Sequence, residues 1–292
     1  MPAENSRQEL FLKILMERYH PGVVEKVLSK SLPLDKAQKI SEISVFFKPS
    51  HRLLTSTEED LSQIHYSWIA EVIEQFPPSF QGSLITSLPI SQSRDLIKFK
   101  NRSDLRKRPL PLITKKFFQN ILHKNIEGFR EILKQDFIRP YPLTKLLDMD
   151  IHLLFEMFDL LGLYDLSIKL KYVIDKKILS NIYDCFSPSR KKFLLSLIHH
   201  TDKIQLSEVD LSNWSGDPIF LKKIIHKKGI LRLGKALSGY PKDFMWHLTH
   251  KLDTGRGRLL MRYYSEEKLS IAESLSEQVL FIINTLTKKN EP

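Results

Sequence analysis

Residues 271–286, IAESLSEQVLFIINTL, carry the clearest helical signal in the chain. Six apolar residues fall at positions i, i+4, i+8, i+11, i+12 and i+15, which is the spacing of one continuous stripe on an α-helix. They are Ile271, Leu275, Val279, Ile282, Ile283 and Leu286. The stripe predicts a helix that packs on the preceding helices of the chain. A helix that binds a partner has the same pattern, and that alternative stays open.

Apolar residues are densest between positions 146 and 195, which predicts the buried centre of the protein. Only 10 of the 292 residues are Gly, against an average share of about 7%. This scarcity argues against glycine-rich β architectures and against nucleotide-binding folds with tight loops. We therefore expect an all-α fold of armadillo-like stacked helical units, preceded by a small N-terminal helical segment.

Proline and charge divide the chain into four parts. The expected parts are an N-terminal helical segment at 1–50, a helical unit at 57–105, a linker at 106–111 and a C-terminal helical domain at 112–292. The linker sequence Arg106-Lys107-Arg108-Pro109-Leu110-Pro111 holds two prolines in three residues, which a helix interior does not tolerate. Shorter helices are expected at 8–18 and 23–32.

The chain is basic, with 45 Lys and Arg against 34 Asp and Glu, a formal net charge of +11. Much of the excess lies in two runs, at 92–125 and 221–262. Such runs attract nucleic acid, an anionic membrane surface or an acidic protein. A solvated helix face gives the same pattern, so the charge alone does not choose among these.

The sequence has no recognisable catalytic motif. Its single cysteine, Cys185, cannot form an intramolecular disulfide and is expected to be a small buried apolar residue. Gly255-Arg256-Gly257-Arg258 has neither the spacing nor the preceding strand of a phosphate-binding loop. His247 and His250 share a helix face but lack a third metal ligand nearby. We expect no catalytic, cofactor-binding or metal site, and a cytoplasmic protein that is not an enzyme.

Residues 57–105 resemble the middle domain of the flagellar rotor switch protein FliG. In that family a Glu-His-Pro-Gln segment opens a helix, a short Asp-Pro turn follows, and Leu-Pro closes the next helix. Of the four-residue segment this chain keeps only the His, as His65. The matching stretches are Ile64-His65-Tyr66-Ser67-Trp68-Ile69-Ala70, Phe76-Pro77-Pro78-Ser79-Phe80 and Leu84-Ile85-Thr86-Ser87-Leu88-Pro89.

Residues from about 229 to 287 resemble the carboxy-terminal domain of the same family in the order and spacing of their apolar positions. In flagellar FliG this domain carries a charged helix with an acidic pair that faces the stator. Arg262 and Tyr263 stand at those positions here, so the resemblance does not predict torque generation. The matching stretches are Leu233-Gly234-Lys235-Ala236-Leu237-Ser238-Gly239, the helix through Phe244, Leu248 and Leu252, Leu259-Leu260, and the final helix from Gln278 to Leu286.

The resemblance implies a structural adaptor of the SctK kind in the sorting platform of a type III secretion or flagellum-like apparatus. Such an adaptor lies at the cytosolic face of the inner membrane and joins an inner-membrane ring protein to a C-ring or pod protein. We expect two binding surfaces, the helix start around 65–68 and the basic face of 222–262. The candidate partner-binding residues are His65, Tyr66, Ser67, Trp68, Lys235, Arg256, Arg258 and Arg262.

Three other functions stay open at this point. A basic helical nucleic-acid-binding protein would use both charge runs as phosphate contacts and would lose affinity steeply with salt. An enzyme without a recognisable motif would show a pocket with titratable residues. A chaperone-like or regulatory protein of the same machine would bind exported substrates instead of the ring.

Overall fold

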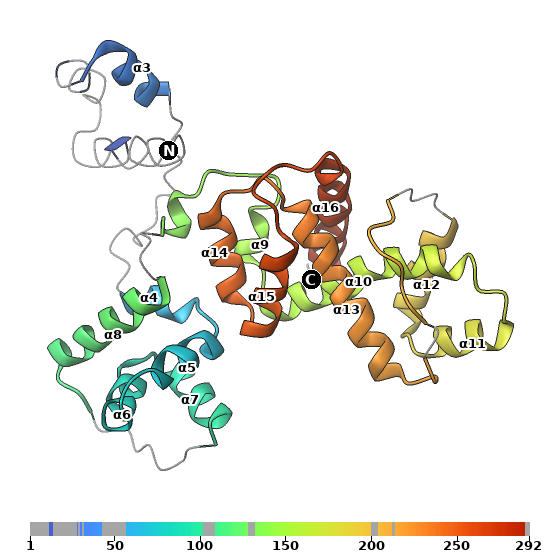
Figure 1. The fold of residues 1–292 in the computed structure, drawn as a ribbon, viewed down its shortest axis with the longest axis horizontal. Coiled ribbons are helices and arrows are strands. Elements are labelled where there is room, and N and C mark those ends of the chain that lie inside the picture. Colours follow the sequence, from blue (N-terminus) through green and yellow to red (C-terminus); the bar gives the residue numbers. More distant parts are fainter. Residues whose placement is uncertain are drawn as a thin grey trace. The chain divides into compact units, whose positions relative to one another are not determined.

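The computed structural model describes residues 12–13, 28, 30, 32–42, 57–101, 109–127, 132–199, 204–211 and 214–289. Every regular element in these ranges is helical, so the all-α fold class is confirmed (Figure 1). The chain divides into two compact units, one of Met1–Leu53 with Leu133–Tyr141 and one of Leu54–Ile132 with Pro142–Pro292. The helices expected at 8–18 and 23–32 lie largely outside the described residues.

The first unit contains helix α3 (Leu34–Glu42) and the short 3-10 helix η2 (Gln135–Phe137). Ala37 and Ile40 of α3 are buried with Leu28 in a small apolar cluster. The ammonium of Lys13 donates a hydrogen bond to the carbonyl of Ser41 at 3.0 Å.

The second unit begins with five helices around one apolar core. They are α4 (Thr57–Ser62), α5 (Tyr66–Glu74), α6 (Pro78–Ser87), α7 (Ile90–Phe99) and α8 (Leu112–Glu127). Helix α8 packs against α4, α5 and α6, so the structure groups residues 112–127 with the segment that precedes the expected linker. Of that linker, residues 106–108 lie outside the described part of the chain, and 109–111 lead into α8.

The remainder of the second unit is built around α10, the longest and most buried helix of the described chain. Fourteen of its residues are buried, which confirms the expected buried centre for residues 146–170, whereas only Ile182 and Leu194 are buried between 171 and 195. Asp150 caps it by accepting a hydrogen bond from the backbone N–H of His152. The helices here are α9 (Lys145–Asp148), α10 (Ile151–Leu170), α11 (Lys176–Asp184), α12 (Pro188–His199), α13 (Pro218–Ala236), α14 (Lys242–Lys251), α15 (Thr254–Tyr263) and α16 (Ala272–Lys289).

Helices α10 and α13 cross in direct backbone contact (Figure 1). A Cβ added at Gly162 would lie 2.0 Å from the carbonyl oxygen of Ile225, and one at Gly229 would lie 1.8 Å from that of Phe158. Only glycine permits so close an approach. The side chains of Asp159 and His226 meet on one side of the crossing, as do those of Asp165 and Arg232 on the other. Because partner numbers rise together, the two helices run in the same direction.

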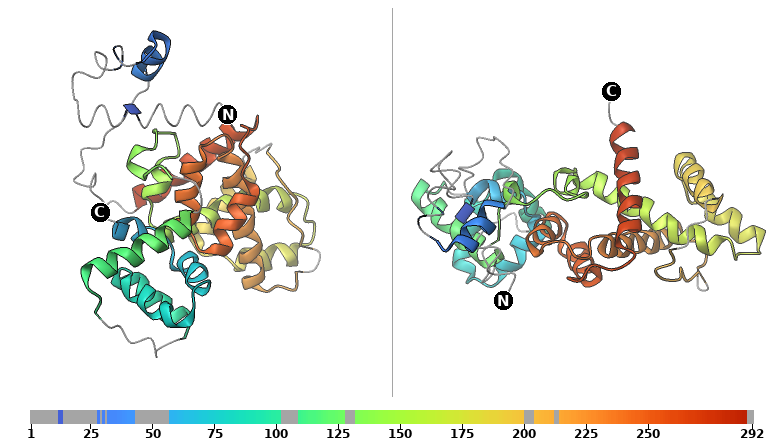
Figure 2. Two further views of the ribbon diagram at one scale, coloured as in Figure 1. Left: turned by 60° about the vertical axis from the view of Figure 1, so that its left-hand side comes forward. Right: turned by 90° about the horizontal axis from the view of Figure 1, so that it is seen from above.

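Helix α16 packs against both members of this pair (Figure 2). The apolar stripe predicted from the sequence is buried at Leu275, Val279, Ile282, Ile283 and Leu286, so the expected packing on preceding helices is confirmed. Among the described residues, no helix combines the length and the apolar character needed to span a bilayer.

Candidate functional site

The start of α5 meets the turn between α14 and α15. The backbone N–H of His65 donates to the carbonyl of His250 at 2.7 Å, and the indole N–H of Trp68 donates to that of Leu252 at 2.9 Å. The backbone N–H of Thr254 donates to the hydroxyl of Ser67 at 3.0 Å. Three expected partner-binding residues are therefore engaged within the chain, at a place we call the α5–α15 junction.

His65 is the N-cap residue of α5, since its ring nitrogen accepts a hydrogen bond from the backbone N–H of Ser67. This is the role that a polar side chain plays at a helix start. Burial lowers the pKa of His65 below its ordinary value. Tyr66 turns to the other side and packs against the rings of His65 and Phe99.

His250 lies between two tryptophans at the junction. Its ring is 4.4 Å from that of Trp68 and 4.2 Å from that of Trp246, centroid to centroid. Its Nδ1 lies 2.8 Å from the carbonyl of Trp246, which identifies this nitrogen as the protonated one. Burial lowers the pKa of His250 to about 4, so the ring is neutral at pH 7.

Arg256 is held by contacts inside the protein. Its Nε donates to Nε2 of His226 at 2.8 Å, and Nη1 lies 2.5 Å from Oδ2 of Asp253, the residue that caps α15. Its guanidinium stacks over the ring of Phe155 at 4.2 Å. His226 in turn contacts Asp159 of α10 at 2.7 Å. Arg256 therefore ties α15 to α13 and α10.

The other basic candidates lie nearer the surface. Arg258 pairs with Glu71 at 2.5 Å and lies over the ring of Trp68, yet 60% of its side chain is exposed. Arg262 is exposed on the same helix, and Lys235 is half-buried on α13. The structure thus brings together His65, Ser67, Trp68, Arg256 and Arg258 and leaves Lys235 and Arg262 outside this junction.

The hairpin α5–α6 and the hairpin α14–α15 have the same design. Their helices begin at 66 and 242 and at 78 and 254, and the second helices end at 87 and 263, each an offset of 176 residues, while the first helices end at 74 and 251, an offset of 177. Leu84 and Leu260 correspond and are both fully buried. Ile85 and Met261 correspond but differ, since Ile85 is 1% exposed and Met261 is 44% exposed.

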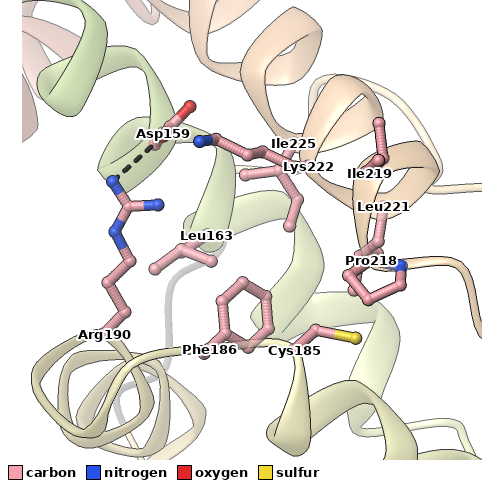
Figure 3. Close-up of a pocket in the computed structure, with 10 residues that line it drawn as sticks. All are labelled: Asp159, Leu163, Cys185, Phe186, Arg190, Pro218, Ile219, Leu221, Lys222 and Ile225. Atoms are coloured by element: carbon pink, nitrogen blue, oxygen red, sulfur yellow. Dashed lines mark ion pairs between the residues drawn. The ribbon is translucent and has the colours of Figure 1, made fainter.

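A second candidate site is a pocket of about 160 Å³ framed by α10, α11, α12 and the start of α13. In Figure 3, Arg190 reaches across to Asp159, with Leu163 and Phe186 below this ion pair. The Arg190 and Asp159 groups are 3.0 Å apart. The pocket is lined by Asp159, Leu163, Cys185, Phe186, Arg190, Pro218, Ile219, Leu221, Lys222 and Ile225.

The sequence reasoning missed this pocket. Cys185, expected to be buried, is half-buried on the pocket wall, and burial raises the pKa of its thiol. The readable signal is Pro188, which begins α12 shortly after α11 ends at Asp184.

Comparisons with family models, with curated proteins and with solved structures give no match for this chain. In the described part of the chain, no group of three or more His, Cys, Asp or Glu side chains is placed to hold a metal ion.

Proposed function

We propose that the chain is a non-enzymatic structural adaptor in the cytosolic platform of a type III secretion or flagellum-like apparatus. It lies at the cytosolic face of the inner membrane and links an inner-membrane ring protein to a C-ring or pod protein. The supporting observation is the repeated hairpin. The two stretches that resemble the middle and carboxy-terminal domains of FliG each contain a helix pair, α5–α6 and α14–α15, and the helices of the two pairs begin at an offset of 176 residues.

The difference between the hairpins suggests where a partner binds. On α6, Ile85 is buried in the cluster that includes Leu122 of α8. On α15, the equivalent Met261 is exposed. A helix of a partner fits against α15 as α8 fits against α6, because the two hairpins present corresponding positions.

The exposed face of α15 is basic as well as apolar. Arg258 and Arg262 lie three residues before and one after Met261, and all three are exposed. Since residues three and four apart share one helix face, this face favours a partner helix with an apolar stripe and flanking carboxylates. We therefore propose Arg258, Met261 and Arg262 as the contact residues.

Nucleic acid is the alternative partner of the basic run at 222–262. Two of its arginines are used inside the protein, Arg232 with Asp165 and Arg256 with Asp253. The lysines of the run include exposed side chains such as Lys222 and Lys223. The alternative therefore depends on lysines and enters the experiment as a separate outcome.

The test is recovery of partners from the native cells with a tagged full-length chain. Extracts are treated with nuclease and washed at about 0.15 M and about 0.5 M salt, and the bound proteins are identified by mass spectrometry. The proposal expects secretion-ring and C-ring proteins that resist nuclease. Ribosomal or nucleoid proteins that disappear with nuclease would overturn it in favour of nucleic-acid binding. Recovery of exported substrates alone would favour a chaperone.

Matched variants locate the contact. Met261→Glu places a charge on the exposed face of α15, and Phe281→Glu makes the same kind of change at an exposed position of α16. We expect at least a tenfold loss of ring or C-ring proteins with Met261→Glu and no loss with Phe281→Glu. Equal recovery with both variants would exclude the α15 face as the contact.

A further inference from the structure

The pocket framed by α10, α11, α12 and α13 has the size of one side chain. Its volume of about 160 Å³ compares with the roughly 150 Å³ of an apolar cavity that binds benzene. Pockets for cofactors and drug-sized ligands measure about 300–1,000 Å³. The space therefore suits one aromatic or branched aliphatic side chain better than a whole cofactor.

The surroundings of the pocket are apolar at the surface. Leu163 and Ile225 form part of the pocket wall and are buried, while Ile219 at its edge is 65% exposed. Phe220, which lies between the lining residues Ile219 and Leu221, is 44% exposed. Exposed apolar surface of this kind is typical of protein-binding sites.

The same helices are strongly basic. Helices α11, α12 and the part of α13 up to Lys228 together hold nine Lys and Arg residues and a single carboxylate, Asp184. The carboxylates just before α11 and α13, Asp175 and Asp217, accept hydrogen bonds from backbone N–H groups as helix caps. The framing surface therefore attracts a negatively charged partner.

Inside the pocket, the negative charge of the Asp159 carboxylate is already balanced by neighbouring groups. Asp159 pairs with Arg190 at 3.0 Å and contacts His226 at 2.7 Å. Lys222 lines the pocket, is exposed and has no ion-pair partner among the described residues. A carboxylate arriving beside an inserted apolar side chain thus meets Lys222, while the Asp159 carboxylate in the pocket is already paired with Arg190.

We propose that this pocket binds a short acidic segment of a partner protein, which inserts one aromatic or branched aliphatic side chain and places its carboxylates against Lys222 and the basic framing helices. Insertion of a bulky apolar anchor into a preformed pocket is a common source of binding energy. The proposal concerns a different surface from the α15 face and stands or falls independently of the secretion apparatus.

The test is selection of random 16-residue peptides displayed on phage against the full-length chain. Enriched peptides are synthesised with a fluorescent label, and their affinity is measured by anisotropy at about 50 mM and about 500 mM salt. The proposal expects a shared apolar residue flanked by Asp or Glu, with affinity that falls at high salt. No enrichment, or enrichment of peptides without acidic residues, would overturn it.

Two pairs of exposed variants separate this pocket from general charge effects. Lys222→Glu alters the pocket, whereas Lys223→Glu makes the same change one residue away, outside the lining. Ile219→Ser alters its apolar edge, whereas Ile174→Ser changes a 94% exposed residue elsewhere. We expect at least a tenfold loss of affinity for the first member of each pair and less than a threefold loss for the second. Equal losses within a pair would overturn the proposal.

A labelled single-stranded RNA of 20 nucleotides is measured alongside the peptides. If the RNA binds more tightly than every selected peptide and responds equally to Lys222→Glu and Lys223→Glu, the surface is an electrostatic nucleic-acid site and the proposal is wrong.

Discussion

Helix α10 carries two aspartates six residues apart, each paired with an arginine, and the two pairs have opposite surroundings. Asp165 and Arg232 lie 2.9 Å apart, and neither side chain has exposed surface. Asp159 and Arg190 lie 3.0 Å apart, but 27% of the Arg190 side chain is exposed. An Asp–Arg ion pair therefore lies at each end of the α10–α13 crossing. The pair at one end is closed to solvent, and the pair at the other end is partly exposed.

The difference comes from what covers each end. Arg232 also donates to Gln278 of α16 at 2.6 Å and to the backbone carbonyl of Ile204 at 3.0 Å. At the other end, the turn from Cys185 to Pro188 and the start of α13 leave the pocket beside Arg190. The Asp165–Arg232 pair is therefore part of the core because α16 covers it. The Asp159–Arg190 pair borders a pocket and is part of a candidate site.

Removal of Arg232 should cause the largest change. Arg232→Met leaves the Asp165 carboxyl buried without its partner, and breaking a buried pair costs about 3–5 kcal/mol. Burial already raises the pKa of Asp165 despite the adjacent guanidinium. We therefore expect Arg232→Met with Asp165→Leu to recover most of the free energy of unfolding, measured by urea denaturation. A double variant no more stable than Arg232→Met would contradict this explanation.

A methyl group added at Gly229 should lower the free energy of unfolding by separating α10 from α13. In Gly229→Ala the new Cβ meets the backbone of Phe158, so the helices must separate, at a cost of about 3 kcal/mol. Gly255→Ala is the control, because its Cβ would meet only the Asp253 carboxylate, at 3.2 Å. The midpoint of urea denaturation should fall for Gly229→Ala alone. A similar midpoint for both variants would show that the crossing tolerates wider spacing.

Acid should weaken the α5–α15 junction through His250. His250 titrates near 6.5 when unfolded and at about 4 when folded, so the unfolded chain binds more protons between these values. Its contribution to stability is complete above pH 6.5 and is lost as pH falls to 4, by up to about 3 kcal/mol. His250→Phe retains an aromatic ring without titration. The unfolding free energy of His250→Phe should depend less on pH between about 4 and 6.5 than that of the wild type.

Removal of Arg190 should have the smallest effect on stability. Asp159 keeps His226 as a partner in Arg190→Met, and the pair is partly exposed, so we expect a loss of about 1 kcal/mol or less. Urea denaturation of Arg190→Met and Arg232→Met under one condition makes the comparison direct. Equal losses would mean that solvent exposure does not distinguish the two ends.

The regular elements were more predictable than the contacts between them. The apolar stripe of α16 and the density of apolar residues in α10 depend on local spacing, which the sequence states directly. Arg232 illustrates the opposite case. It belongs to a run that resembles a basic surface, yet it is among the largest fully buried side chains. Its burial depends on Asp165 and Gln278, which are distant in sequence.

The candidate site shows the same division. His65 and Trp68 were expected to bind a partner, but their polar atoms bond within the chain, Trp68 to a carbonyl 184 residues away. The pocket joins residues from α10 to α13 across more than 60 positions, and no single motif contains them. The correspondence of Ile85 and Met261 also becomes apparent only when the two hairpins are aligned by their offset of 176 residues.

The parallel contact of α10 and α13 corresponds to two matched seven-residue segments of the sequence. Asp159-x-x-Gly162-x-x-Asp165 on one helix faces His226-x-x-Gly229-x-x-Arg232 on the other, and the residue numbers of corresponding positions differ by 67. A slip of one turn would move Gly162 and Gly229 away from the backbones of Ile225 and Phe158 and would separate both ionic contacts. The paired pattern therefore specifies the register in which the two helices pack.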